Sequence, residues 1–242
     1  MKKVVAVIPV RYGSTRLSGK PLKKINGKPL IQIIYENVEK TALFSDVVVA
    51  TDSSLIFDVV KIFGGKVKMT SSQHKCGTDR VAEICQQINA EIILNIQGDE
   101  LFITKEPLSK LIQAFSNTDV SVATLIHPIY DLDGINNPNI VKVIFDKDDF
   151  AIYFSRSPIP YQQIVGKIQI KYYEHIGVYA FRKNALLNFA TLHQSKLEKA
   201  EKLEQLRLIE NGIKIKVVKT DYSGFSINTK EDLNKAITYM KY

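Results

Sequence analysis

The amino-acid sequence predicts an α/β fold with a doubly wound, mostly parallel sheet. Two observations carry this prediction. Short apolar, β-branched runs such as 4–8 and 92–96 are typical of strands buried on both faces. Segments with apolar residues at helical spacing separate these runs up to residue 126. Alternating strands and helices favour a parallel sheet with right-handed crossovers.

The individual elements follow from the same patterns. Asn26-Gly27 predicts a turn, Gly64-Gly65 and Gly212 end helices, and Thr229 resembles the start of a capping box. Strands are expected over 4–8, 46–50, 66–69, 92–96, 120–126, 140–145, 151–154, 172–181 and 213–219. Helices are expected over 29–38, 55–63, 81–88, 108–115, 183–189, 197–210 and 229–240.

The chain of 242 residues, 45% of them hydrophobic, is long enough for one sizeable core. Alternation of strands and helices ends near residue 127, and a turn-rich loop over 131–139 follows. The next elements are a predicted hairpin and a strand over 172–181. No repeat or linker divides the sequence, so residues 1–242 are predicted to form one domain with a smaller sub-lobe at about 127–190.

The formal net charge of +8 suits a nucleic acid, an anionic surface or a polyanionic small substrate. Basic residues are scattered, without the concentrated patch of a nucleic-acid reader, so no nucleic-acid partner is expected. No apolar run reaches the roughly 20 residues of a membrane span. The first apolar run stops at Pro9 without a cleavage site, which favours a cytoplasmic protein. Cys76 and Cys85 form neither a metal spacing nor a disulfide framework.

The stretch 11–20 follows the first strand and contains two glycines and three cations, Arg11, Arg16 and Lys20. Backbone freedom combined with positive charge suits a polyphosphate, although a solvated basic loop is the alternative. The stretch lacks the Gly-x-Gly-x-x-Gly spacing of dinucleotide sites. Pro21 follows Lys20 where a P-loop carries serine or threonine. Neither hydride transfer nor P-loop hydrolysis is therefore favoured.

Three polar, glycine-bearing loops, 11–20, 70–80 and 97–100, each follow a predicted strand. Because ligands of such sheets bind outside the carboxyl ends of the strands, all three loops should open onto one crevice. Asp99 in the third loop suits Mg²⁺ beside phosphate oxygens, with a turn or helix N-cap as the alternative. Cations next to a metal-binding carboxylate favour phosphoryl or nucleotidyl transfer.

Residues 11–22, Arg-Tyr-Gly-Ser-Thr-Arg-Leu-Ser-Gly-Lys-Pro-Leu, resemble the Arg-x-x-Ser-x-Arg-Leu-Pro-Gly-Lys-x-Leu signature of cytidylyltransferases that activate acidic sugars. The chain is most similar to the 3-deoxy-manno-octulosonate (KDO) cytidylyltransferases. The resemblance extends in order along nearly the whole sequence, through 50–52, 77–80, 95–100, 153–156, 175–179 and 203–207.

The resemblance implies the reaction CTP + KDO → CMP-KDO + pyrophosphate, with Mg²⁺, in lipopolysaccharide biosynthesis. It also implies a fold like that of nucleotide-diphospho-sugar transferases, a smaller lobe for sugar binding and dimerisation, and a cytoplasmic homodimer. Arg11, Lys20 and Asp99 would be catalytic. The implied nucleotide-binding residues are Arg11, Ser14, Arg16, Lys20, Gly77, Thr78, Arg80 and Gln97. The implied sugar-binding residues are Gln97, Arg156, His175, Tyr179, Glu204 and Gln205, and the implied metal ligands are Asp99 and Asn228.

Residues considered alone also allow structural roles. His175 suits a satisfied structural histidine, Tyr179 a core residue, and Glu204 and Gln205 a solvated helix face. Arg156 suits the carboxylate of an acidic sugar, because an arginine fork matches that planar group.

The sequence departs from the family pattern at Ser18, Cys76, Leu101 and Asn228. Asn228 matters most, because the family carries aspartate there as its second metal carboxylate. A neutral amide oxygen binds Mg²⁺ more weakly, so we expect weaker metal affinity or an altered substrate. The alternatives are the 8-amino analogue of KDO, a nonulosonate, or a catalytically silent CTP-binding protein. Glu100 resembles the KDO branch rather than the 8-amino branch.

Overall fold

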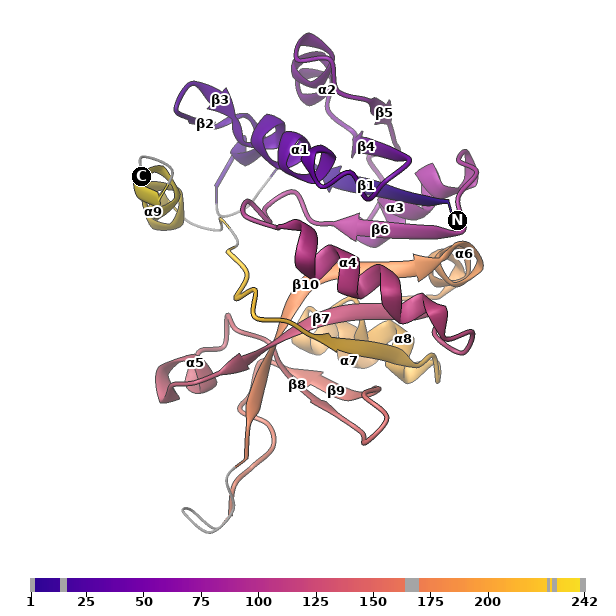
Figure 1. The fold of residues 1–242 in the computed structure, drawn as a ribbon, viewed down its shortest axis with the longest axis vertical. Coiled ribbons are helices and arrows are strands. Elements are labelled where there is room, and N and C mark those ends of the chain that lie inside the picture. The colour runs from indigo at the N-terminus through magenta and orange to yellow at the C-terminus, as the bar shows by residue number, and fades with distance from the viewer. Residues whose placement is uncertain (1–2, 14–16, 164–169, 226, 228–229, 240–242) are drawn as a thin grey trace.

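The computed structural model describes residues 3–13, 17–163, 170–225, 227 and 230–239 (Figure 1). A mixed sheet forms the centre of the molecule, and six of the seven strands along its main path run in the same direction. In spatial order the strands are β11 (Ile215–Lys219), β7 (Val122–Ile129), β10 (Tyr172–Arg182), β6 (Ile92–Ile96), β1 (Val4–Val10), β4 (Asp46–Thr51) and β5 (Val67–Met69). The predicted doubly wound, mostly parallel sheet is confirmed.

Helices cover both faces of the sheet and enclose two apolar cores (Figure 1). One face packs against α1 (Leu30–Lys40), α2 (Ser54–Ile62), α4 (Lys105–Gln113) and α9 (Lys230–Tyr239). The other packs against α3 (Gly77–Gln86), α6 (Lys183–Thr191) and α8 (Leu206–Glu210), with α7 (Lys196–Glu201) beside α8. Short 3₁₀ turns, η1 (Lys20–Leu22) and η2 (Ala114–Ser116), and the small hairpin β2 (Lys24–Ile25)–β3 (Lys28–Pro29) complete these layers. No helix in the described part of the chain combines the length and apolar character needed to cross a bilayer.

The central strands end together at one edge of the sheet. β1 is buried along its whole length, as its continuous apolar run predicts. Its last residue, Val10, pairs with Thr51 at the end of β4, and Val7 pairs with Asn95 near the end of β6. The loops that follow these strands therefore start side by side.

β10 connects the predicted sub-lobe to the middle of the sheet. Its first residues pair with β7 and, at Glu174, with β8 (Lys142–Phe145), which forms the predicted hairpin with β9 (Ala151–Ser155). Its later residues lie antiparallel between β6 and β7. The β10–β7 register shifts between Ile176 and Tyr179, which is a bulge of the kind that often adjoins active sites.

The single helix expected over 197–210 is wrong. The chain forms α7 and α8, separated at Lys202, whose φ of 55° is left-handed. Apolar spacing continues through this break, so periodicity alone predicts one helix. The loop expected over 131–139 also contains a short helix, α5 (Leu132–Asn136), which Asp131 caps by accepting a hydrogen bond from the Gly134 backbone.

Candidate active site

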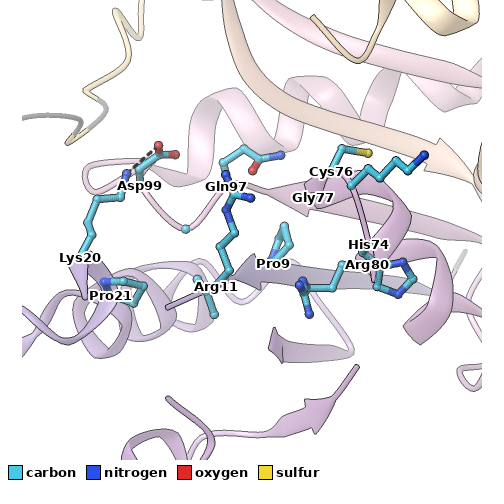
Figure 2. A pocket seen from close by; sticks show the side chains of 13 residues that line it. Pro9, Arg11, Lys20, Pro21, His74, Cys76, Gly77, Arg80, Gln97 and Asp99 are labelled. Atoms are coloured by element: carbon cyan, nitrogen blue, oxygen red, sulfur yellow. Dashed lines mark hydrogen bonds and ion pairs between the residues drawn. The ribbon is translucent and has the colours of Figure 1, made fainter. Parts of the chain in front are cut away.

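A cavity of about 260 Å³ opens at the carboxyl ends of β1 and β6. Residues from all three loops, 11–20, 70–80 and 97–100, line it, so the prediction of one shared crevice is confirmed. Six predicted site residues contribute to its wall: Arg11, Lys20, Gly77, Arg80, Gln97 and Asp99. Figure 2 shows Lys20 and Asp99 at one end, His74, Cys76 and Arg80 at the other, and Arg11 and Gln97 between them.

Close approach of two loops requires glycine at Gly98. A Cβ there would overlap Val10 Cγ1 and lie 3.1 Å from the Pro9 carbonyl oxygen. Gly77, at the start of α3, faces Gln97, because its Cβ would lie 3.1 Å from Gln97 Oε1. The backbone of the cavity wall is thus packed tightly at the two points where α3 and the loop after β6 meet β1.

Lys20 and Asp99 form an ion pair at one end of the cavity. Lys20 Nζ lies 3.0 Å from Asp99 Oδ2 and also donates to the Ile227 carbonyl oxygen. The exposed fractions of the two side chains, 13% and 25%, leave the pair accessible from the cavity. The loop after β1, the loop after β6 and the segment that precedes α9 therefore meet at one charged point.

Arg80 is held within the opposite wall. Its guanidinium is buried, pairs with Asp52 at 2.7 Å, and donates to the Thr70 hydroxyl and the Ser71 carbonyl oxygen. These bonds fix Arg80 as part of the wall, whereas Arg11 is exposed at the cavity. Arg11 and Lys75 therefore supply exposed positive charge to the cavity, and Lys20 supplies a third cation that is held by Asp99.

The 70–80 loop contributes residues that were not singled out as ligand contacts. His74, Lys75 and Cys76 line the cavity. His74 Nε2 bonds to Glu83, which lowers the pKa of that carboxyl together with the Ser71 backbone amide, against the opposing effect of burial. The polar character of the loop predicted its location. Cys76 was marked only as a departure from the family pattern, and nothing in the sequence marked His74 or Lys75 individually.

The residues expected to bind sugar form a second group next to the cavity. Glu204 accepts from Thr78 Oγ1 at 2.7 Å and from the Thr78 backbone amide at 3.4 Å. Burial raises the pKa of Glu204 and that of the Tyr179 phenol. The Tyr179 ring lies 5.2 Å from the His175 ring. The Glu204 side chain therefore points toward the start of α3 and does not lie on a solvated helix face.

His175 is enclosed by aromatic side chains and Thr124. Its Nε2 lies 3.0 Å from Thr124 Oγ1, and its ring lies 5.1 Å from Phe154. Burial lowers the pKa of His175 to about 3, because the charged imidazolium loses its hydration. The side chain is neutral at physiological pH and acts through hydrogen bonds, not charge.

Arg156 and Gln205 lie beside the same α7–α8 turn. Arg156 donates from Nε to the Glu201 carbonyl oxygen at 2.8 Å and from Nη1 to the Pro138 carbonyl oxygen at 2.9 Å. Gln205 is buried, and its Nε2 has no hydrogen-bond partner within the described residues. An unpaired buried amide is costly, so Gln205 suits a role in ligand binding.

A buried arginine fixes the α7–α8 turn. Arg207 donates to both carboxylate oxygens of Glu198, at 2.8 and 2.7 Å, and pairs with Asp79 of α3 at 3.2 Å. Its guanidinium also lies 4.4 Å from the centroid of the Phe189 ring. This clamp joins α8 to α3 and so holds Glu204 against Thr78.

Comparisons with known proteins agree with this geometry. The cytidylyltransferase family model matches residues 5–215. The 3-deoxy-manno-octulosonate cytidylyltransferase of Christiangramia forsetii is 46% identical, with 97% of this chain and 95% of that protein covered. The enzyme of the same name from Thermodesulfovibrio yellowstonii is 48% identical, with 96% of each covered. The chain belongs to the KDO cytidylyltransferase family.

Solved structures extend this likeness to the fold. A CMP:2-keto-3-deoxy-manno-octonic acid synthetase in complex with CTP superposes with a TM-score of 0.93 at 41% identity, covering 99% of this chain and 98% of that one. The 4-diphosphocytidyl-2C-methyl-D-erythritol synthase of Anaerococcus prevotii superposes with a TM-score of 0.66 at 18% identity, covering 100% of this chain and 99% of that one. This second likeness shows a shared fold.

Three residues that the KDO cytidylyltransferase resemblance implicates, Ser14, Arg16 and Asn228, lie outside the described residues. Within the described ranges no three His, Cys, Asp or Glu side chains gather to form a metal site. Asp99 supplies one carboxylate at the cavity, beside the cations that suit a triphosphate. This donor set fits Mg²⁺, which combines few protein carboxylates with phosphate oxygens and water.

Proposed function

We propose that this protein activates KDO by the reaction CTP + KDO → CMP-KDO + pyrophosphate, for lipopolysaccharide biosynthesis. The observation that carries the proposal is the cavity where Arg11 and Lys20 meet Asp99 at the carboxyl edge of a parallel sheet. Membership of the KDO cytidylyltransferase family supports the choice of nucleotide and sugar.

The anomeric hydroxyl of the sugar attacks the α-phosphorus of CTP, the bond from that phosphorus to the bridging oxygen breaks, and pyrophosphate leaves. Arg11 and Lys20 hold the triphosphate and neutralise charge that builds on the leaving group. The family resemblance also assigns Ser14 and Arg16 to nucleotide binding. Gly77 and Arg80 form the nucleotide side of the cavity, where Gly77 lies close to Gln97.

The sugar binds next to the nucleotide, among the polar side chains described above as the second group. Arg156 reads its carboxylate, and its bonds to Glu201 and Pro138 set the plane of the guanidinium. Glu204 accepts hydrogen bonds from the hydroxyls of the sugar, and Gln205 donates to them. His175, which burial keeps neutral, and Tyr179 contribute hydrogen bonds without adding charge.

Asp99, assisted by Asn228, would hold Mg²⁺. When bound, the ion neutralises phosphate charge and polarises the reacting oxygens. Asn228 offers an amide oxygen where the family carries a carboxylate, so this chain would need more Mg²⁺ than its relatives.

We also propose that the protein works in the cytoplasm, where CTP is available, as a homodimer. Three large side chains of the sub-lobe, Tyr130, Leu132 and Tyr161, are 80%, 74% and 86% exposed. Their burial between two copies would account for this exposure. Light scattering coupled to size exclusion should give twice the mass of 27.3 kDa.

A pyrophosphate-release assay with purified protein tests the proposed reaction. The reaction mixtures contain Mg²⁺, one of four nucleoside triphosphates, and KDO, 8-amino-KDO or a nonulosonate. Release with CTP and KDO, well above the other combinations, is the expected result. Faster release with another sugar would mean that this sugar, and not KDO, is the substrate. CTP binding without release at any Mg²⁺ concentration would indicate a catalytically silent protein.

A further inference from the structure

Asn95 is a fully buried polar side chain in β6, a strand whose other residues are apolar. A buried amide is tolerated only when it is hydrogen-bonded. Asn95 Nδ2 donates to Thr78 Oγ1 at 2.9 Å, and Asn95 Oδ1 accepts from Gln97 Nε2 at 3.3 Å. The side chain therefore bridges the first turn of α3 and the loop that follows its own strand.

The bridge is part of a longer chain of hydrogen bonds. Thr78, 1% exposed, donates from Oγ1 to Glu204 Oε1 at 2.7 Å. Gln97 at one end lines the cavity, and Glu204 at the other belongs to the group proposed to bind the sugar. Four side chains thus join the two halves of the site through the protein interior.

With Glu204 ionised, each link in this chain of hydrogen bonds has one direction; with Glu204 protonated, every link reverses and both amide groups turn over. The Thr78 hydroxyl has one proton, and a carboxylate only accepts, so the proton is directed to Glu204. Asn95 must then present its NH₂ group to Thr78 and its carbonyl oxygen to Gln97. Gln97 must donate from Nε2, which leaves its Oε1 facing the start of α3, beside Gly77. Glu204 therefore sets the orientation of an amide group in the cavity wall.

We propose that Asn95 is a positioning residue that couples the two substrate subsites. A ligand that bonds to Glu204 and a ligand that bonds to Gln97 favour the same orientation of the chain, so each strengthens binding of the other. This coupling is reciprocal by thermodynamic necessity. The identity of the two ligands, CTP and the acidic sugar, rests on the proposed function.

Calorimetric titration measures the coupling without turnover. CTP is titrated into the protein with Mg²⁺, in the absence and presence of a saturating KDO analogue that carries hydrogen in place of the anomeric hydroxyl. In the native protein we expect the analogue to tighten CTP binding about tenfold, within the usual range for coupled sites. The reverse titration should give the same factor.

Two substitutions at Asn95 interrupt the chain of hydrogen bonds in different ways. Asn95→Leu keeps the branched arrangement of heavy atoms, is somewhat larger and has no polar atoms. Asn95→Asp keeps the shape but replaces the donor to Thr78 with an acceptor. Both should reduce the coupling to under about twofold, with each ligand alone changing less than about threefold. Thr78→Val interrupts the same chain at its next member and should also abolish the coupling. It serves as a second test if either Asn95 variant fails to fold.

Thr41→Val is the matched control. Thr41 is 5% exposed, and its hydroxyl donates to the Val38 carbonyl oxygen at the end of α1, away from the site. Its loss should leave the coupling unchanged. Retained coupling in the folded Asn95 and Thr78 variants, or independent binding of the two ligands in the native protein, would overturn the inference. Failure to bind either ligand would instead overturn the proposed function, and the inference with it.

Discussion

Lys20 Nζ lies 3.0 Å from Asp99 Oδ2, so the cation proposed to hold phosphate neutralises the carboxylate proposed to hold Mg²⁺. The ion pair weakens Asp99 as a metal ligand, because a metal ion and the ammonium group would compete for the negative charge of one carboxylate. Arrival of Mg²⁺ with the triphosphate would let Lys20 exchange the carboxylate for phosphate oxygens. The ion pair therefore holds both groups near the positions that the substrates require.

Lys20→Met should bind a metal ion more tightly when nucleotide is absent. The partly exposed ion pair contributes up to about 1 kcal/mol, so we expect Mn²⁺ affinity to rise by about two- to fivefold. Electron paramagnetic resonance of free Mn²⁺ gives the affinity directly. Turnover should fall, because the phosphate contact is lost. Lys75→Met, in the same cavity wall, is the control and should leave Mn²⁺ affinity unchanged. Equal Mn²⁺ affinity in the native protein and in Lys20→Met would mean that Asp99 is not a metal ligand.

Asn228→Asp should lower the Mg²⁺ concentration needed for half-maximal pyrophosphate release by about threefold or more, because a carboxylate binds Mg²⁺ more strongly than an amide oxygen. A Mg²⁺ titration of both proteins at saturating CTP and KDO makes the comparison. An unchanged requirement would mean that position 228 does not lie near the metal.

Gly98→Ala should destabilise the protein and impair CTP binding together. The added Cβ overlaps Val10 Cγ1 and approaches the Pro9 carbonyl oxygen, and overpacking of this kind costs about 1–3 kcal/mol. Urea unfolding measures the loss. Gly13→Ala is the control, because its Cβ would meet nothing within 4 Å. Similar unfolding free energies for the two variants would contradict the close approach seen at Gly98.

Glu174→Gln should alter the pH dependence of stability. Burial, followed by the charges of Glu100 and Asp131, raises the pKa of Glu174 from 4.5 to about 7. The folded protein then holds a proton that the unfolded chain releases, so this group's contribution to stability is complete below pH 4.5 and is lost as the pH rises to about 7. We expect the variant to gain stability relative to the native protein at pH 8, by at most about 3 kcal/mol, and little at pH 4. Glu91→Gln, at an exposed carboxylate, should show no such trend.

Arg207→Met should cost about 3–5 kcal/mol of folding free energy, because it leaves the buried carboxylate of Glu198 without its partner. Thermal unfolding and sugar KM are the measurements, and the KM should rise because the turn that carries Glu204 is released. Arg182→Met is the control. Arg182 also lies over an aromatic ring, that of Phe115, but donates to backbone carbonyls outside the site. A larger effect on sugar KM at Arg182 would contradict the role of the clamp.

Local sequence patterns predicted the elements that local forces determine. The apolar run of β1 and the helical spacing of α1 were sufficient, because β1 is buried along its whole length and α1 buries one face. The break at Lys202 could not be predicted, because it depends on Arg207 reaching Asp79 and on Glu204 reaching Thr78, more than a hundred residues away.

The candidate site divides in the same way. Loop composition placed Arg11, Lys20 and Asp99 at one crevice, because strand ends in a parallel sheet share an edge. The proposed positioning role of Asn95 could not be predicted from the sequence. A single asparagine within an apolar run has no partner until the fold brings Thr78 beside it.

The central position of β10 has a consequence for the order in which the molecule is made. β6 and β7 leave the ribosome well before residues 172–182, yet they flank β10 and cannot complete the sheet without it. Until then one edge of β6 and both edges of β7, which also pairs with the later strand β11, lack their partners, and unpaired edges are sites of aggregation. A fragment that ends before residue 172 should therefore be insoluble, and the nascent chain needs its later strand, or a chaperone, to protect the first half of the fold.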